Sequence, residues 1–410
     1  MTITALKTNS PEQILQSLFA QQANQSASQS DAIARVLDKG APTRRTERWR
    51  YTPLRKVFSP DMAMSADSIA QVPSHPALEK LSNTVQLTIL NGQVHGKIDS
   101  ADIQVNVTEN ATSVNPLKHQ DTFIDDLNIA FCNKVIHIKL AGLLESQLVI
   151  HLHHSLLNAL QATRLEISCA DNCDAKILLL HTSDSASQST LIPVTILTAG
   201  QNSDIELIHV QDLGSDSNQL GKSHFQIHRD AVVTFTQLEL GGQLVRHDVV
   251  ADVLEPGAEF NVSELMHTTD KQHHDTHLDV YHHAEHTQST MQVKAVLDDK
   301  SRGVFNGKIY VEKDAQQINA NLNNDNLLLS QYAEINTKPE LEIYADDVKC
   351  AHGATVGQLD EQALFYLRSR GIDPDEAEKI LIAAFSRSTY QALVPQDLEH
   401  WLDQRLGFKA

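Results

Sequence analysis

The spacing of apolar residues changes twice along the chain. In the first part apolar positions recur every three or four residues, as they do on one face of a helix. From Thr84 they alternate with polar positions, which is typical of strands, and after Gly357 the helical spacing returns. We therefore predict a mainly β fold, with a β core over residues 84–356 between helical regions over residues 1–83 and 357–410.

Helix-start and helix-stop signals support the two helical regions. Ser10 offers an N-cap that is followed by a proline, and a polar loop over residues 21–30 is expected before a second helix near Asp31. In the C-terminal region Gly371 suits the position just after a helix, and Asp373 offers an N-cap for the next helix.

Three stretches of the β region carry more local predictions. Asn91-Gly92 lies between two alternating segments and predicts a tight hairpin. Residues 127–154 are rich in isoleucine, leucine and valine and are expected to form strands. Residues 321–330 begin with several asparagines and continue as an apolar run, so they are expected to form a tight corner between strands.

A loose repeat runs through the β region from Asp174 onward. Polar turns that end in a small residue lead into alternating strands, and these turns recur every 26 to 31 residues. A period of this size without intervening helices predicts a β-solenoid, in which stacked rungs share one core. A pair of β-sandwiches with irregular turns is the alternative. The small residues of the repeat are Ala175, Ser203, Ala231, Ala258, Ala284 and Ala315.

Composition narrows the class of protein. The net charge of −19 argues against nucleic acid or an anionic membrane surface as the main partner, because both favour basic patches. We read no signal peptide, and no apolar run approaches the roughly 20 residues that span a bilayer. Four cysteines in 410 residues are too few for a disulfide scaffold, so a cytoplasmic location is expected.

Common catalytic motifs are missing from the sequence. The nearest stretch to a phosphate-binding loop, residues 92–98, is one residue short and lacks the hydroxyl residue that would hold magnesium. No Gly-x-Gly-x-x-Gly follows a strand, and no Gly-x-Ser-x-Gly occurs. We therefore assign no catalytic residue and expect that the chain is not an enzyme, so any nucleotide hydrolysis would belong to a partner.

Histidines are concentrated in residues 267–286, which hold seven of the 21 in the chain. If this segment is a strand, His282 and His286 share a face and are candidate ligands of a single metal ion. The competing interpretation is a polar rung with exposed histidines that face a partner, and the absence of any helical metal motif favours it. The carboxylates that could complete such a metal site are Asp270, Asp275 and Asp279.

The cysteines divide into two groups. Cys169 and Cys173 resemble half of a metal clamp, but no second cysteine pair exists, so they are expected to be small core or turn residues. Cys350 and His352 lie two apart at the end of a predicted strand, so their side chains point to one face. A thiolate and an imidazole both suit iron, yet two ligands are too few for a cluster. Other residues of this chain or of a second chain must complete such a site.

Three segments in residues 301–385 resemble the SufB/SufD family of iron–sulfur cluster assembly proteins. They are "SRGVFNGKIYVEKDAQQINANLNNDNLLLS", "KPELEIYADDVKCAHGATVGQLDEQALFYLRSRGI" and "EAEKILIAAF". The stretch "ERWRYTPL" near residue 50 resembles the N-terminal signature of the SufD branch. SufB-type chains usually carry "EHEAT" where this chain has "CAHGAT", which also favours the SufD branch.

The resemblance implies a right-handed parallel β-helix between helical regions, and a complex with SufB and two copies of the SufC ATPase. It places Cys350 and His352 at the interface with SufB, where a transient iron–sulfur cluster would form, with no cofactor held stably by the isolated chain. Reduced flavin is a further candidate participant. The C-terminal helices would dock SufC, and Phe365, Tyr366 and Arg370 are the candidate contacts, although a helix-core role is an equal alternative for the two aromatic residues.

Two other functions are compatible with parts of the sequence. A β-helical enzyme acting on polysaccharide would need aromatic residues and paired carboxylates along a groove, and only 5% of the residues are aromatic. A self-contained metalloprotein would use the histidines of residues 267–286. Saccharide binding or cleavage would identify the first, and stoichiometric metal in the isolated chain would identify the second.

Overall fold

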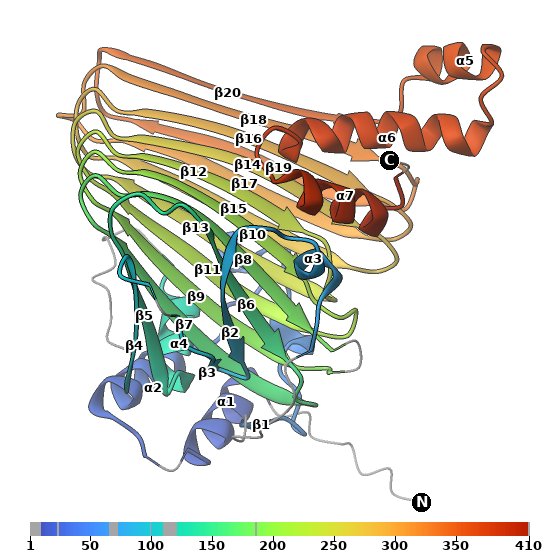
Figure 1. Cartoon of the computed structure of the whole chain (residues 1–410). Helices are drawn as coiled ribbons and strands as arrows, with labels where there is room; N and C mark the ends of the chain where they lie inside the picture. The colour runs from blue at the N-terminus through green and yellow to red at the C-terminus, as the bar shows by residue number, and fades with distance from the viewer. Residues whose placement is uncertain are drawn as a thin grey trace, which may run out of the picture.

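Most of the chain winds into a parallel β-solenoid of about eight turns (Figure 1). The computed structural model describes residues 10–22, 24–64, 73–98, 100–109, 121–184 and 187–408. Each turn contributes one strand to each of two facing sheets, so each strand from β5 to β18 pairs with the strand two later in the sequence. The mainly β fold with helices at both ends and the solenoid prediction are therefore confirmed.

Sheet A contains the odd-numbered strands from β5 to β19 and a terminal antiparallel strand. In spatial order they are β4 (Ile103–Glu109), β5 (Lys134–Leu140), β7 (Ala159–Cys169), β9 (Thr190–Ala199), β11 (Asn218–Ile227), β13 (Leu244–Val253), β15 (His273–His282), β17 (Arg302–Val311) and β19 (Glu334–Ile343). The short β1 (Ala63–Met64) pairs with β7.

Sheet B faces sheet A across the core. In spatial order its strands are β3 (Gln93–His95), β2 (Thr84–Leu90), β6 (Gln147–His154), β8 (Asp174–Ser183), β10 (Asp204–Asp212), β12 (Val232–Glu239), β14 (Glu259–Thr268), β16 (Gln288–Leu297), β18 (Ile318–Leu328) and β20 (Val348–Gly357). The antiparallel β2–β3 pair encloses Asn91 and Gly92, both with positive φ, so the predicted hairpin is confirmed.

Corners with left-handed backbone conformation set the length of each turn. One residue of each corner before β8, β10, β12, β14, β16 and β18 has φ between 53° and 77°, and the column consists of Asn172, Asn202, Asp230, Gly257, His286 and Gln317. Asparagine, aspartate and glycine tolerate this conformation better than other residues do. The corner residues recur with the period of the predicted repeat, and each donates its backbone N–H to a carbonyl of the next corner.

The predicted repeat has the right period, but its register is wrong in three places. Backbone hydrogen bonds stack Ser203, Ala231 and Ala258 in one column, as predicted. Ala175 lies two residues beyond the matching position and pairs with Ile205. Ala284 and Ala315 lie before their corners, and the matching buried residues are a threonine at position 287 and an isoleucine at position 318.

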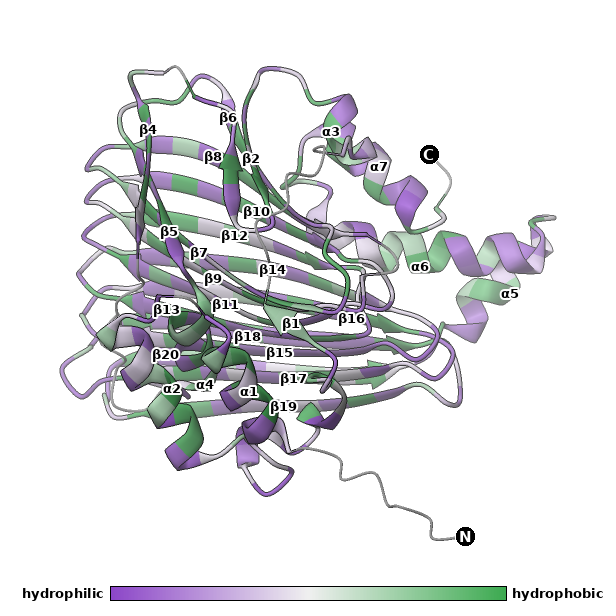
Figure 2. Cartoon of the chain, turned by 90° about the horizontal axis from the view of Figure 1, so that it is seen from below, coloured by the Kyte–Doolittle hydropathy of each residue, from purple (hydrophilic) through white to green (hydrophobic). Residues whose placement is uncertain are grey.

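The N-terminal helices cover the outer face of sheet A (Figure 2). They are α1 (Pro11–Ala20), α2 (Ala27–Lys39), the 3-10 turns η1 (Glu47–Trp49) and η2 (Leu54–Lys56), and α4 (Phe123–Phe131). Ser10 and Gln13 form the capping box that starts α1. A second capping box at Ser26 starts α2 within the stretch that was predicted to be a loop.

Three helices follow the solenoid: α5 (Glu361–Ser369), α6 (Pro374–Tyr390) and α7 (Gln396–Arg405). Of these, α6 and α7 pack on the outer face of sheet B, together with the short α3 (Pro76–Glu79). Asp373 caps α6 through its carboxylate, and Gly371 has a φ of 86° just after α5, as the sequence predicted. In Figure 1, α5 projects beyond the solenoid from the end of α6.

Two of the local predictions are wrong. Residues 127–131 belong to α4, whose apolar side chains are buried against sheet A, and the strand begins only at Lys134. The asparagines of residues 321–330 do not form a corner. They lie within β18, where Asn324 and Asn326 are buried between the sheets.

Candidate functional site

The last turn of the solenoid leaves both sheets open at one end. β19 and β20 are the outermost strands of sheets A and B, and within the described part of the chain no strand pairs with their outer edges. In Figure 1 this end lies at the top. Unpaired strand edges offer backbone donors and acceptors to another chain, and exposed Tyr344 and Val356 add apolar surface beside them. This end therefore has the properties of an interface.

β20 places Cys350 and His352 at this open end. Cys350 is in register with Ala320 and His352 with Leu322, and both of these β18 partners are fully buried core residues. The two side chains consequently occupy inward-facing positions of a turn that no further turn covers. Cys350 is half-buried and packs against the end of the core, whereas His352 is exposed. The structure thus confirms that the pair shares one face of a strand.

The Cys350 thiol is not activated by its surroundings in the isolated chain. Burial raises its pKa above the ordinary value, and a backbone hydrogen bond at Ala320 only partly offsets this effect. Because the thiolate is the form that binds iron or accepts sulfur, a metal ion or a charge from elsewhere must displace the proton. The pair is therefore chemically incomplete on its own.

A buried polar group lies directly behind the open end. Asn324 Oδ1 accepts hydrogen bonds from Thr337 Oγ1 and Asn326 Nδ2, both at 2.7 Å. The latter nitrogen also donates to the Thr355 carbonyl at 2.8 Å, so it ties β20 to β18. The sequence reading missed these residues because it assigned the asparagines to a corner. Asparagines recurring two apart in a strand would have indicated a polar inner face.

The candidate ATPase-docking residues lie on α5. None of the α5 side chains is buried; Phe365 is 72% and Tyr366 56% exposed. The Arg370 guanidinium lies over the Tyr366 ring, 5.2 Å from its centroid. The alternative that the two aromatic residues are helix core is therefore wrong, and α5 presents an aromatic surface that nothing in the described chain covers.

The structure does not bring His282 and His286 together as ligands. β15 ends at His282, and His286 lies at an exposed corner, so the prediction that one strand holds both is wrong. The ring nitrogens of His282 are hydrogen-bonded to Thr287 Oγ1 at 2.7 Å and Ser289 Oγ at 3.0 Å. The competing prediction of exposed histidines is also wrong for much of the segment, because His274 and His277 are buried as well.

The carboxylates proposed to complete that metal site have other partners. Asp275 binds the Arg246 guanidinium at 3.2 Å and His277 Nε2 at 3.1 Å, and Asp279 binds Arg48 at 2.8 Å. Asp270 lies at an exposed corner with a φ of 53°. These contacts attach the "ERWRYTPL" segment to sheet A.

Cys169 and Cys173 are free thiols buried in the solenoid core, as expected for small core residues.

Comparison with known proteins identifies the family. The model of the SUF system FeS cluster assembly SufBD core domain matches residues 152–385, from β6 into α6. This chain belongs to the SufB/SufD family. It is 28% identical to the iron–sulfur cluster assembly protein SufD of Escherichia coli (strain K12) over 92% of this chain and 90% of that protein, which supports the SufD branch. The chain therefore has a role in iron–sulfur cluster assembly.

Two other relatives match about half of the chain. An iron–sulfur cluster assembly SufBD family protein of Synechocystis sp. is 35% identical over 47% of this chain and 43% of its own length. The chloroplastic protein ABCI7 of Arabidopsis thaliana is 30% identical over 47% of this chain and 41% of its own length.

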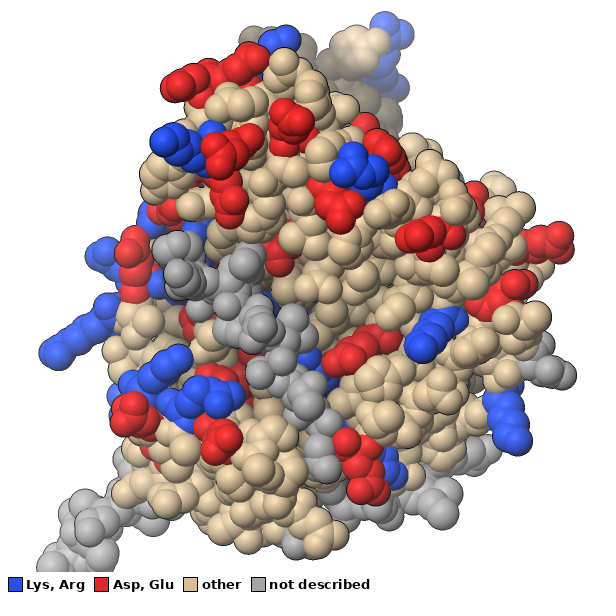
Figure 3. Space-filling view, turned by 90° about the vertical axis from the view of Figure 1, so that its left-hand side faces the viewer, with Lys and Arg blue, Asp and Glu red and all other residues tan. Residues whose placement is uncertain are grey.

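Two remaining features of the molecule are the charge on its surface and the length and hydrophobicity of its helices. On the face shown in Figure 3, acidic side chains are spread widely and basic ones lie among them. Such a mixture is unlike the basic stripe of a nucleic-acid-binding protein. None of the helices in the described ranges is both long and apolar enough to cross a bilayer.

Proposed function

We propose that this chain is a non-enzymatic scaffold subunit that pairs with SufB through the open end of its solenoid. The observation that carries the proposal is the coincidence of two features on β20, an unpaired strand edge and the Cys350–His352 pair. A solenoid needs a cap at each end of its core, and a second solenoid that continues the sheets would supply one. The same contact would bring the missing ligands of a cluster to Cys350 and His352.

Each residue of the pair has a defined task in this proposal. The thiolate of Cys350 binds iron or accepts sulfur while a cluster is built, and the His352 imidazole supplies a nitrogen ligand. The iron and sulfur are cargo. SufB would contribute further ligands, and the arriving iron would favour loss of the Cys350 proton, whose pKa is raised by burial.

We further propose that α5 docks the SufC ATPase in the cytoplasm. Phe365 and Tyr366 form the exposed apolar part of its surface, and Arg370 adds a charge beside them. Aromatic and arginine side chains are the residues most often found at the centres of interfaces. Because α6 packs on sheet B, a movement of α5 driven by the ATPase would be transmitted to the solenoid.

The first experiment measures the mass in solution of this chain mixed with SufB and SufC. We expect an assembly with one SufB and two SufC. Phe365→Glu should reduce the SufC content and leave the pairing with SufB intact, whereas Val356→Arg at the open end should reduce pairing with SufB. The matched control is Leu157→Glu, because Leu157 is also an apolar side chain, is 67% exposed, and lies away from both proposed interfaces. A chain that stays alone beside intact partners would refute the proposal.

The second experiment tests the Cys350–His352 pair in the assembled complex. Cys350→Ala and His352→Ala should leave the complex intact and lower the yield of clusters in anaerobic reconstitution. Lys349→Ala is the control, because this exposed neighbour lies on the opposite face of β20. Wild-type cluster yield in both variants would show that the pair has no part in assembly.

A further inference from the structure

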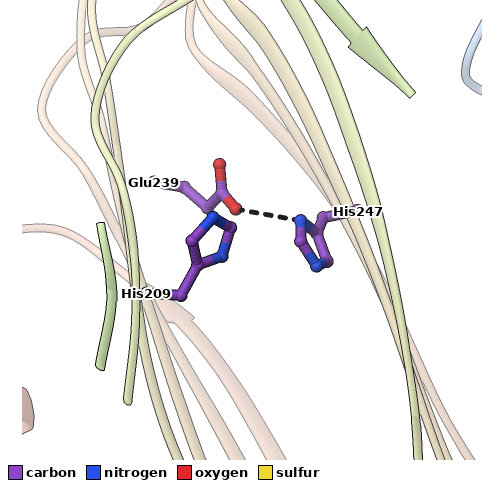
Figure 4. Close-up of side chains that lie close together, drawn as sticks. All are labelled: His209, Glu239 and His247. Carbon is purple, nitrogen blue, oxygen red and sulfur yellow. Dashed lines mark ion pairs between the residues drawn. The ribbon is translucent and has the colours of Figure 1, made fainter. Parts of the chain in front are cut away.

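The interior of the solenoid contains a cluster of ligand-type side chains far from the open end. His209 on β10, Glu239 at the end of β12 and His247 on β13 are each at most 3% exposed. One ligand atom from each residue lies within 4.8 Å of the other two. Figure 4 shows the three side chains converging from two sides.

The geometry draws on both sheets. His209 and Glu239 come from neighbouring turns of sheet B, where His209 is in register with Gln237, two residues before Glu239. His247 reaches in from sheet A, and its Nδ1 atom lies 3.6 Å from Glu239 Oε1. The two imidazole rings are 5.0 Å apart between centroids. Two nitrogen ligands and one carboxylate thus face a common point.

Several polar atoms at this point have no hydrogen-bond partner. They include Glu239 Oε2 and His209 Nδ1, both buried. A buried polar atom without a partner costs about 1–3 kcal/mol, so such atoms are rare in folded proteins. Two of them on neighbouring ligand-type side chains indicate a ligand that would satisfy them together.

The backbone leaves room beside the ligands. Gly221 on β11 is in register with His247. A Cβ atom added at this glycine would lie 3.0 Å from Gln219 Nε2 and 3.1 Å from His247 Nδ1, closer than side-chain atoms normally approach. Glycine at this inward-facing position therefore keeps the space next to the imidazole free.

We propose that His209, Glu239 and His247 bind one divalent first-row metal ion, such as zinc or ferrous iron, inside the solenoid. Two imidazoles and a carboxylate are a ligand set found for both of these ions, whereas calcium and magnesium prefer oxygen ligands alone. The site differs from the histidine segment singled out in the sequence, and it runs against the expectation that the isolated chain holds no cofactor.

The experiment measures metal in the full-length chain alone. Because the ligands are buried, metal-free protein is refolded from guanidinium with Zn²⁺, Co²⁺ or Mg²⁺, and unbound ions are removed by gel filtration. We expect about one Zn²⁺ or Co²⁺ per chain and no Mg²⁺. Bound Co²⁺ should give visible absorption bands that differ from those of the aqueous ion. Elemental analysis of protein purified without chelators would then show whether zinc or iron occupies the site in cells.

Variants decide whether these three residues hold the ion. Glu239→Gln and His209→Gln should lose it, whereas His154→Gln, which alters an equally buried histidine two turns away, should keep it. The proposal is overturned if Glu239→Gln retains as much Zn²⁺ as the wild type, because the ion would then be held elsewhere. It is also overturned if the wild type retains no Zn²⁺ and shows only aqueous Co²⁺ absorption, a result that requires no variant to fold.

Discussion

Arg246 on β13 fixes the N-terminal segment to the solenoid, and its replacement by methionine is the most informative perturbation of the fold. Its side chain is fully buried, and it binds Asp248 at 2.9 Å and Asp275 at 3.2 Å. The guanidinium also lies 3.7 Å from the centroid of the buried Trp49 ring and donates to the Arg48 carbonyl. These contacts join residues about 200 apart in the sequence.

The structure indicates how much the free energy of unfolding should fall in Arg246→Met. Burial by itself would raise the pKa of Asp248, but Arg246 and neighbouring cations lower it below the ordinary value, so the carboxylate is held as an anion. Arg246→Met retains much of the side-chain volume but leaves the Asp248 and Asp275 carboxylates without their arginine. Removing one partner of a buried ion pair costs about 3–5 kcal/mol. This is a large part of the roughly 5–15 kcal/mol that stabilises a typical domain.

Equilibrium unfolding in urea, followed by circular dichroism, measures this loss. The matched control is Arg302→Met, because Arg302 forms an exposed ion pair with Glu334 at 3.7 Å and such pairs contribute about 0–1 kcal/mol. Adding Asp248→Asn and Asp275→Asn to Arg246→Met should recover part of the loss, since the buried charges are then removed together. If Arg246→Met and Arg302→Met unfold at the same urea concentration, the buried network does not hold the segment in place.

Three further predictions test other parts of the fold. Burial lowers the pKa of His154 to about 3, so the unfolded chain binds a proton that the folded chain does not, and stability should fall as the pH drops below about 6.5. His154→Gln should reduce that slope by up to about 1.4 kcal/mol per pH unit, measured from urea midpoints at several pH values, and an unchanged slope would contradict this. Trp401→Ala empties a buried site where α7 meets sheet B, at a cost of about 3–5 kcal/mol, and should make limited proteolysis after Gly357 faster. Gly307→Val adds atoms within 2.7 Å of Phe305 Cζ and should destabilise by about 1–3 kcal/mol, whereas Gly357→Ala, with no atom within 4 Å of an added Cβ, should not.

Local signals predicted the ends of the helices and the length of the repeat, because they act over a few residues. The Ser10 capping box, the Asn91-Gly92 hairpin and Gly371 all depend on backbone geometry that the residue itself favours. The corner column was also readable, since Asn172 and Asn202 occupy left-handed positions one turn apart. A search for asparagine, aspartate and glycine at a constant spacing would have fixed the register better than a search for small residues.

The interior metal ligands could not be predicted because both faces of the strands are buried. On β10, Leu207 points into the solenoid and Ile208 points outward against the C-terminal helices. The usual alternation of apolar and polar residues is therefore lost, and His209 gives no sign of facing inward. Only the pairing of β10 with β12, together with the position of β13 across the core, brings His209 to Glu239 and His247.

The two ends of the solenoid differ in a way that favours the open end for the proposed pairing. At the first end the sheets finish in antiparallel pairs, β2–β3 and β4–β5, which turn the chain back on itself. At the other end β19 and β20 both present an outer edge, and soluble proteins normally protect such edges by charge, proline or cover. β19 carries Pro339, which removes one backbone donor, whereas β20 has no proline. Of the two edges, β20 is thus better suited to continue into a partner's sheet, and it is the strand that carries Cys350 and His352. Pairing at this edge would complete the sheet and the ligand set in one step.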